Sequence, residues 1–196
     1  MDHRRSALWL SIFTVGYNLL EGAVSVLFAA LDGSPALLGF GVDSFVESLS
    51  GAVMIWRFWR PEASNIREQR AARLVGISLV ILAAYVAYEA ARALIGNRAP
   101  DRSLAALVIA LLSLAVMPTL FLLKQRIGRN LGSRSLIADS KQTLACMLLS
   151  VALLVGTGLN YRWGLWQADP VAALLIALYL VREGYEALTT SEVCSC

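Results

Sequence analysis

Apolar residues dominate six stretches of the chain, and each stretch is about 20 residues long, which is the length of a helix that crosses a bilayer. None of them shows the alternation of polar and apolar positions typical of a half-buried strand. Since only helices and closed barrels satisfy their backbone hydrogen bonds in lipid, the pattern predicts an all-α membrane protein with six transmembrane helices. The predicted spans are Leu8–Ala29, Ala36–Trp59, Leu74–Ile95, Leu104–Leu123, Leu136–Leu159 and Leu165–Leu188.

The connections between these spans are short, so we expect one six-helix transmembrane domain over residues 1–190 and a short tail over residues 191–196. The composition agrees, because 58% of the residues are hydrophobic, whereas soluble domains have about 45–50%. The first stretch is longer than the apolar core of a signal peptide and lacks a small-residue cleavage signal after it. It is therefore interpreted as a true span.

Positive charges lie mainly at one set of span ends, and their distribution predicts the orientation. Arg4 and Arg5 precede the first span, and two clusters flank the second and fourth connections: Arg57, Arg60, Arg67, Arg70 and Arg73, and Lys124, Arg126, Arg129 and Arg134. The positive-inside rule then places both termini in the cytoplasm, in a plasma membrane of bacterial type. The net charge of +3 reflects this topology and does not indicate nucleic-acid binding, since the basic residues mark span ends rather than a soluble face.

Two predicted spans contain polar side chains at helical spacing. Asp43 and Glu47 lie four residues apart in the second span, and Asp139, Gln142 and Cys146 lie within seven residues in the fifth. Such spacing places each set on one face of its helix. Because carboxylates in hydrocarbon are costly and two acids one turn apart repel each other, the two faces predict a site for a cation. A carboxamide oxygen and a thiolate could complete it, and a thiolate favours soft or borderline metals such as zinc or cadmium.

A short internal similarity connects the same two regions. The segments GSPALLGFGVDSFVES from Gly33 and GSRSLIADSKQTLAC from Gly132 align Asp43 with Gln142 and Glu47 with Cys146. Because the two spans run in opposite directions, this suggests an inverted repeat of three plus three spans, which places a site at the repeat interface near the midplane. At a rise of about 1.5 Å per residue, Asp43 is expected near the depth of Cys146, and Glu47 near that of Gln142.

Other polar residues have competing interpretations. Glu21 and Asn18 share a face of the first span and are candidates for the ion pathway or for proton coupling, or for a bundle contact. Glu89 and Arg92 are expected to form a local ion pair. Lys141 is expected to extend to the cytoplasmic interface.

The acids and the fifth-span segment together resemble the cation diffusion facilitator family of divalent-metal/proton antiporters. The second-span acids match Asp43 and Glu47, the segment IADSKQTLAC keeps Ala138 and Asp139 of the fifth-span motif, and QADPVAALL contains the family's Ala-Asp-Pro opening of the sixth span. The resemblance covers essentially the whole chain. The chain is most similar to the short branch without the cytoplasmic C-terminal domain, and to the vesicular zinc-efflux transmembrane proteins.

The chain departs from the family motif at two ligand positions. Family members usually bind the metal with two second-span acids and a fifth-span histidine and aspartate, but Gln142 and Cys146 stand at the latter positions. His3 is the only histidine of the chain. The resemblance therefore implies a metal site formed by Asp43, Glu47, Asp139, Gln142 and Cys146, with an altered fifth-span half.

The sequence leads to a functional hypothesis with two alternatives. The leading expectation is efflux of Zn²⁺ or Cd²⁺ by metal/proton antiport with alternating access, in a homodimer implied by the resemblance. The alternatives are a non-transporting, metal-binding regulatory membrane protein and a proton-coupled antiporter of small cations. No resident cofactor and no nucleic-acid partner is expected, and no nucleophile–base set suggests an enzyme. Cys194 and Cys196 in the tail either collect soft metals or have no role.

Overall fold

The computed structural model describes residues 3–32, 35–59, 65–96 and 104–189, and within these ranges it contains six helices and no strand. This confirms the predicted all-α fold. The predicted tail over residues 191–196, with Cys194 and Cys196, lies outside the described residues. The helices are α1 (His3–Asp32), α2 (Pro35–Trp59), α3 (Asn65–Ile95), α4 (Leu104–Leu131), α5 (Arg134–Trp163) and α6 (Ala168–Thr189).

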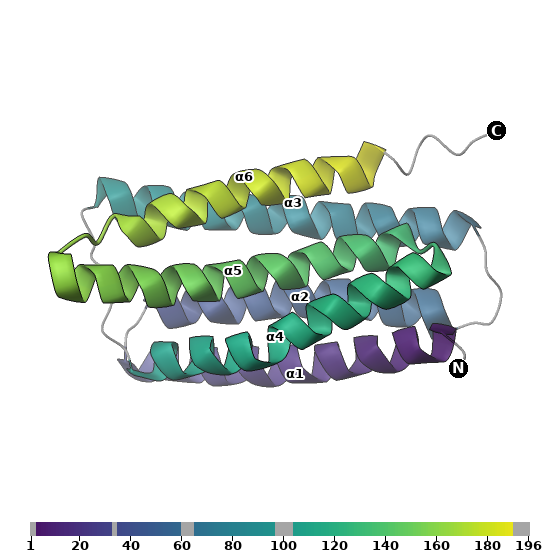
Figure 1. Cartoon of the computed structure of the whole chain (residues 1–196), viewed down its shortest axis with the longest axis horizontal. Coiled ribbons are helices and arrows are strands. Elements are labelled where there is room, and N and C mark those ends of the chain that lie inside the picture. The colour runs from purple at the N-terminus through teal and green to yellow at the C-terminus, as the bar shows by residue number, and fades with distance from the viewer. Residues whose placement is uncertain (1–2, 33–34, 60–64, 97–103, 190–196) are drawn as a thin grey trace.

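The helices form an elongated bundle in which α1, α2, α4 and α5 surround the interior and α3 pairs with α6 along one side (Figure 1). The most extensive contacts join α1 to α2, α3 to α6 and α4 to α5. The start of α1 and the end of α6 lie at the same end of the bundle (Figure 1). We call this the terminal end, and the opposite one the far end.

The helix contacts partly match an inverted repeat of three plus three helices. Exchanging α1, α2 and α3 with α4, α5 and α6 maps the α1–α2 contact onto α4–α5, and the α2–α3 contact onto α5–α6. However, α3 packs against α5, whereas no contact between α2 and α6 is present among the described residues. The contact between α2 and α4 likewise has no counterpart between α1 and α5 among the described residues, so the helix contacts match the expected repeat only in part.

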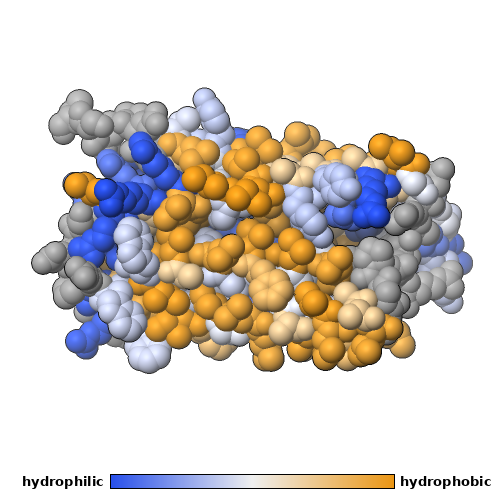
Figure 2. Space-filling model, turned by 180° about the vertical axis from the view of Figure 1, so that it is seen from behind, coloured by the Kyte–Doolittle hydropathy of each residue, from blue (hydrophilic) through white to orange (hydrophobic). Residues whose placement is uncertain are grey.

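The exterior is that of a membrane protein. Large apolar side chains are exposed along the helices, such as Trp9 at 69% and Leu20 at 67%. Hydrophobic residues cover the middle of the face shown in Figure 2, and hydrophilic residues gather toward the ends, most densely at the terminal end. Of the described helices, α1 to α5 are long and apolar enough to cross a membrane.

Helix α6 is the most charged of the expected spans. Its 22 residues would extend about 33 Å, close to the thickness of a bilayer core. It carries Asp169 in its first turn and Arg182, Glu183 and Glu186 toward its end. It packs along α3 and α5, and among the described helices it is the one that is not apolar enough to count as a span by length and composition.

Small residues explain how closely α3 and α6 pack. A Cβ atom placed on Gly184 would lie 2.8 Å from Val80 Cγ2 and 3.1 Å from the Gly76 carbonyl oxygen. Because these distances are too short for ordinary contacts, the helix pair requires glycine at this crossing.

Helix α4 contains Pro118 in its interior. Proline removes a backbone hydrogen bond and bends a helix. Figure 1 shows the C-terminal half of α4 slanting toward α5. The sequence placed the end of this span at Leu123, but the helix continues to Leu131, and this extension brings Lys124 into the interior.

A polar network joins three helices at the terminal end. Arg57 of α2 forms an ion pair with Glu68 of α3 at 2.6 Å. Glu68 also accepts hydrogen bonds from the Ser133 hydroxyl and the Ser135 backbone N–H, at 3.0 and 2.7 Å. Ser133 is the N-cap of α5, so this network fixes the start of α5 against α2 and α3.

Candidate cation site

The polar faces of α2 and α5 meet in the interior, as the sequence predicted, and their residues pair in antiparallel order. The Asp43 carboxyl and the Cys146 thiol are neighbours. One turn further along α2, Glu47 accepts a hydrogen bond from Thr143. One turn further again, Ser50 donates a hydrogen bond of 2.5 Å to Asp139 Oδ1. In these successive pairs the residue number increases along α2 and decreases along α5, as expected for two antiparallel helices.

The largest departure from the sequence-based expectation is Lys124, which was assigned to the basic cytoplasmic end of the fourth span. Its side chain has no exposed area. Its Nζ lies 2.8 Å from Asp139 Oδ2 and 3.5 Å from Glu47 Oε1. It also donates a hydrogen bond of 2.8 Å to the Thr143 hydroxyl. Lys124 thus donates hydrogen bonds to Thr143 and Glu47 and forms an ion pair with Asp139.

These contacts divide the predicted metal-ligand set into two parts. Glu47 and Asp139 share the Lys124 ammonium, and we call these three residues the inner triad. Asp43 and Cys146 lie beyond the triad along the helices. Within the described ranges, no three His, Cys, Asp or Glu side chains converge on one metal-sized position.

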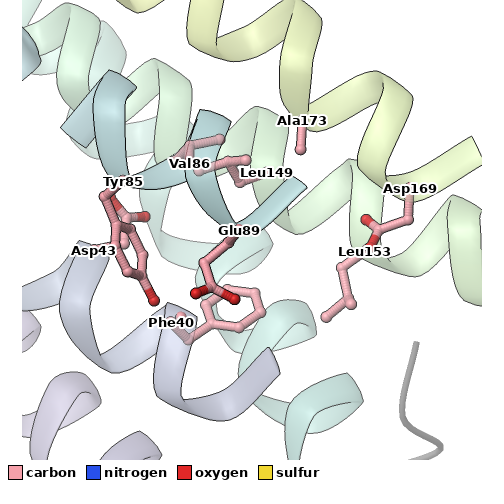
Figure 3. Close-up of a pocket in the computed structure, with 10 residues that line it drawn as sticks. Phe40, Asp43, Tyr85, Val86, Glu89, Leu149, Leu153, Asp169 and Ala173 are labelled. Carbon is pink, nitrogen blue, oxygen red and sulfur yellow. The ribbon is translucent and has the colours of Figure 1, made fainter. Parts of the chain in front are cut away.

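Asp43 is the acid of this set that opens on a cavity. It is 4% exposed, and its Oδ1 has no hydrogen-bond partner among the described residues. It lines a pocket of about 160 Å³ that is formed by α2, α3, α5 and α6. Figure 3 shows Asp43 beside Tyr85 on one side of the pocket, Asp169 on the other, and Glu89 between them. The residues lining this pocket come from the start of α2 and α6 and from the later parts of α3 and α5, so it lies toward the far end.

Two of the pocket's other acids show how it approaches the surface. Glu89 pairs with Arg92 at 3.6 Å, which confirms the predicted local ion pair, and the Arg92 side chain is half exposed. Asp169 lies in the first turn of α6. A Cβ atom on Gly156 of α5 would come within 2.5 Å of Asp169 Cβ, so the glycine is what lets Asp169 pack there. The pocket is thus lined by three carboxylates, those of Asp43, Glu89 and Asp169.

Gln142 is buried, but it turns toward α3 rather than α2. Its Oε1 accepts a hydrogen bond of 3.1 Å from Ser78. Its Nε2 has no hydrogen-bond partner among the described residues. The neighbouring Thr143 takes the place opposite Glu47 that the depth estimate gave to Gln142.

Glu21 and Asn18 of α1 are both buried in the interior. Glu21 accepts hydrogen bonds from Ser44 at 3.0 Å and from Tyr17 at 3.3 Å. Asn18 has no exposed area, and neither atom of its amide has a hydrogen-bond partner in the described part of the chain. Glu21 therefore connects α1 to α2 next to Asp43, while Asn18 presents an unsatisfied amide to the interior.

Lys141, which was predicted to extend to the cytoplasmic interface, has partners on α6. Lys141 forms an ion pair with Glu183 of α6 at 3.2 Å, and its side chain is 26% exposed. It also lies over the Tyr179 ring, with Nζ 5.9 Å from the ring centroid. Lys141 thus connects α5 to α6.

Three residues of the site were missed by the sequence analysis: Ser50, Thr143 and Lys124. The first two have a recognisable signal, because spacings of four and three residues extend the Asp43–Glu47 face to Ser50 and connect Asp139 through Thr143 to Cys146. Gln142 also fits a helical spacing from Asp139, so spacing alone does not decide whether Gln142 or Thr143 faces Glu47. Lys124 follows a run of apolar residues, where a lysine is usually assigned to a span end.

Comparison with known proteins relates the chain to membrane transporters of cations. The cation efflux transmembrane domain family matches residues 67–191, which is more than half of the chain. The chain is similar to transmembrane protein 163 of Xenopus laevis, with 23% identity over 95% of this chain and 68% of that protein. It is also similar to uncharacterized transporters of Synechocystis and Methanocaldococcus jannaschii, each 24% identical over 89% and 92% of this chain.

The chain spans 59% and 66% of the length of those two transporters. The family match begins within α3 and runs through α6, so it includes Lys124 and the α5 half of the site, while α2 with its two acids precedes it. The match to transmembrane protein 163 extends over nearly the whole chain. With six helices, an apolar exterior and buried acids at the meeting of α2 and α5, the chain is a multi-pass integral membrane protein that belongs to the cation efflux family of cation transporters.

Proposed function

We propose that this protein exports a divalent transition metal, Zn²⁺ or Cd²⁺, from the cytoplasm in exchange for protons. The observation that carries the proposal is Asp43, a buried carboxylate with an unpaired oxygen at the inner end of a pocket. A carboxylate in such a place needs a proton or a cation to offset its charge. We therefore propose that Asp43 is the residue that binds the ion where the pocket from the far end reaches the interior.

The chemistry of the neighbouring side chains favours a borderline metal. Cys146 lies next to Asp43, and a sulfur ligand selects zinc or cadmium over magnesium or calcium. Glu47 and Asp139 supply two further carboxylates at the inner triad. Carboxylates and thiols bind metals in their deprotonated forms, so binding of the ion releases protons. This provides the exchange without a histidine.

The route of the ion follows from the position of the pocket. The pocket leads from Asp43 toward the far end, which the positive-inside rule assigns to the outside. On the terminal side of Asp43, the inner triad fills the space between α2, α4 and α5. We propose that this arrangement is an outward-directed state, and that the opposite state opens on the terminal side.

The proposal is tested with the purified full chain in liposomes that contain a pH-sensitive dye. Zn²⁺, Cd²⁺, Mn²⁺, Ni²⁺ and Mg²⁺ are added in turn, and proton flux is followed. We expect flux with Zn²⁺ and Cd²⁺ and little with Mg²⁺. Asp43→Asn should reduce the zinc-dependent flux to the level of empty liposomes. Glu183→Gln, which changes a partly exposed acid outside the pocket in the same acid-to-amide way, is the matched control and should retain flux.

The two alternative functions give different results in the same assay. Zinc binding without any flux would indicate a regulatory metal-binding protein. Proton flux driven by organic cations, together with no binding of zinc or cadmium, would indicate a small-cation antiporter. The homodimer is proposed from the family resemblance, and the mass of the detergent-solubilised protein by light scattering tests it.

A further inference from the structure

The environment of Lys124 resembles a cation site that is already filled. Three oxygens surround its ammonium group: Asp139 Oδ2 at 2.8 Å, Thr143 Oγ1 at 2.8 Å and Glu47 Oε1 at 3.5 Å. Two of these oxygens belong to carboxylates, and none of the Lys124, Glu47 and Asp139 side chains has any exposed area. Carboxylate and hydroxyl oxygens are also ligands for metal ions.

We propose that Lys124 is a tethered competitor of the transported ion, whose ammonium occupies the inner part of the ion site and must withdraw before Glu47 and Asp139 bind metal. This inference rests on the proposed function and deepens it, because it identifies the residue that controls access to two of the ligands. The competitor is part of α4, so its withdrawal is a movement of α4 relative to α2 and α5.

Charge balance indicates that the Lys124 ammonium and a metal ion compete for Glu47 and Asp139 and do not bind there together. In their ionised forms, Glu47 and Asp139 carry two negative charges, which match one divalent ion when the ammonium is absent. With Lys124 in place, one of these charges is already offset, and a metal ion within bonding distance of the same oxygens would lie against the ammonium. Like charges at such short distances in a low-dielectric interior repel strongly.

The position of Lys124 in the bundle explains how its withdrawal would affect the whole protein. Its contacts with Glu47 and Asp139 connect α4 to both α2 and α5 in the interior. An ammonium group that leaves these oxygens must find other polar partners, because a lone buried charge is costly. Lys124 lies six residues after Pro118 on α4, and a proline is a point at which a helix bends. Binding of metal at the inner pair and displacement of α4 are therefore linked.

The test compares metal affinity and transport in the purified full chain. Zn²⁺ and Cd²⁺ are titrated by calorimetry into the wild-type protein, Lys124→Gln, Lys124→Arg and Lys141→Gln. Lys124→Gln should bind metal about tenfold more tightly, or better, because the competitor is gone, and it should lose turnover in liposomes. Lys124→Arg keeps the charge and should not gain affinity. Lys141→Gln removes a partly exposed lysine paired with Glu183 and should resemble the wild type in affinity and transport.

A second comparison covers the case in which Lys124→Gln fails to fold. Lys124→Gln with Asp139→Asn removes both charges of the closest pair and leaves Glu47 available to the metal. Its affinity is measured against that of Asp139→Asn alone, and it should again be higher when the lysine is absent. Unchanged or weaker affinity on loss of the lysine in a folded protein would overturn the competitor role while leaving the proposed function standing. A wild-type protein that neither binds nor transports any of the metals would overturn both.

Discussion

Lys124 Nζ of α4 lies 2.8 Å from Asp139 Oδ2 of α5, and neither side chain has any exposed area. A lysine that hydropathy places at the membrane surface is thus part of the interior. Its partner Asp139 also accepts the Ser50 hydrogen bond from α2, so three helices meet at this carboxylate. A buried ion pair of this kind does not by itself add much stability, because desolvation offsets its attraction. The presence of this ion pair in the proposed ion path is therefore better explained by specificity or function.

This pair leads to a prediction about stability. Asp139→Asn should destabilise the protein by about 3–5 kcal/mol, because the Lys124 charge loses its closest partner. The double change Lys124→Met and Asp139→Leu should cost less, since both charges are removed together. Thermal unfolding in detergent measures the difference. Glu183→Gln is the control, because Glu183 pairs with Lys141 at a partly exposed site, where about 0–1 kcal/mol is expected. A larger loss in the double variant than in Asp139→Asn would contradict the prediction.

Cys146 should affect the choice of metal. Because sulfur is a better ligand for cadmium than for zinc, Cys146→Ser should reduce cadmium-dependent proton flux more than zinc-dependent flux. Ser113, whose hydroxyl lies 3.9 Å from the Cys146 sulfur, provides the control variant Ser113→Ala, which keeps the thiol. Equal losses for the two metals in Cys146→Ser would argue against sulfur ligation.

Gln142 should act through α3. Its Oε1 accepts a hydrogen bond from Ser78, so Gln142→Ala and Ser78→Ala should have similar effects on zinc affinity. Both effects should be smaller than that of Asp43→Asn, which removes the carboxylate at the inner end of the pocket. Calorimetric titration of the three variants tests the order. If Gln142→Ala alone abolishes binding and Ser78→Ala has no effect, the amide is a direct ligand, as its spacing in the sequence suggested.

The α3–α6 crossing should not tolerate a side chain at Gly184. A Cβ atom there would lie 2.8 Å from Val80 Cγ2, and overpacking of this kind costs about 1–3 kcal/mol. Gly184→Ala should therefore lower the midpoint of thermal unfolding. Gly16→Ala in α1 is the control, because a Cβ there meets no atom within 4 Å, and alanine favours a helix by about 1 kcal/mol. A midpoint unchanged in Gly184→Ala would show that the two helices can separate without cost.

The sequence by itself determined the six helices and the helix faces that carry the buried acids. Continuous apolar runs of bilayer length specify six helices, and the spacing of Asp43, Glu47 and Asp139 specifies which helix faces carry the acids. Both signals are local, because they depend on hydropathy and on the period of one helix. The structure brings the acid faces of α2 and α5 together and puts Cys146 next to Asp43, as the helical rise predicted.

Only the tertiary structure decided how these faces are completed. Gln142 and Thr143 are adjacent in sequence and both fit a helical spacing, but the rotation of α5 against its neighbours turns Thr143 to Glu47 and Gln142 to Ser78. Lys124 is a span-end residue by composition, but α4 continues beyond it and packs it between two buried carboxylates. Helix rotation and the partners of a buried charge depend on packing between segments far apart in the chain, and a pattern read along one helix does not contain that information.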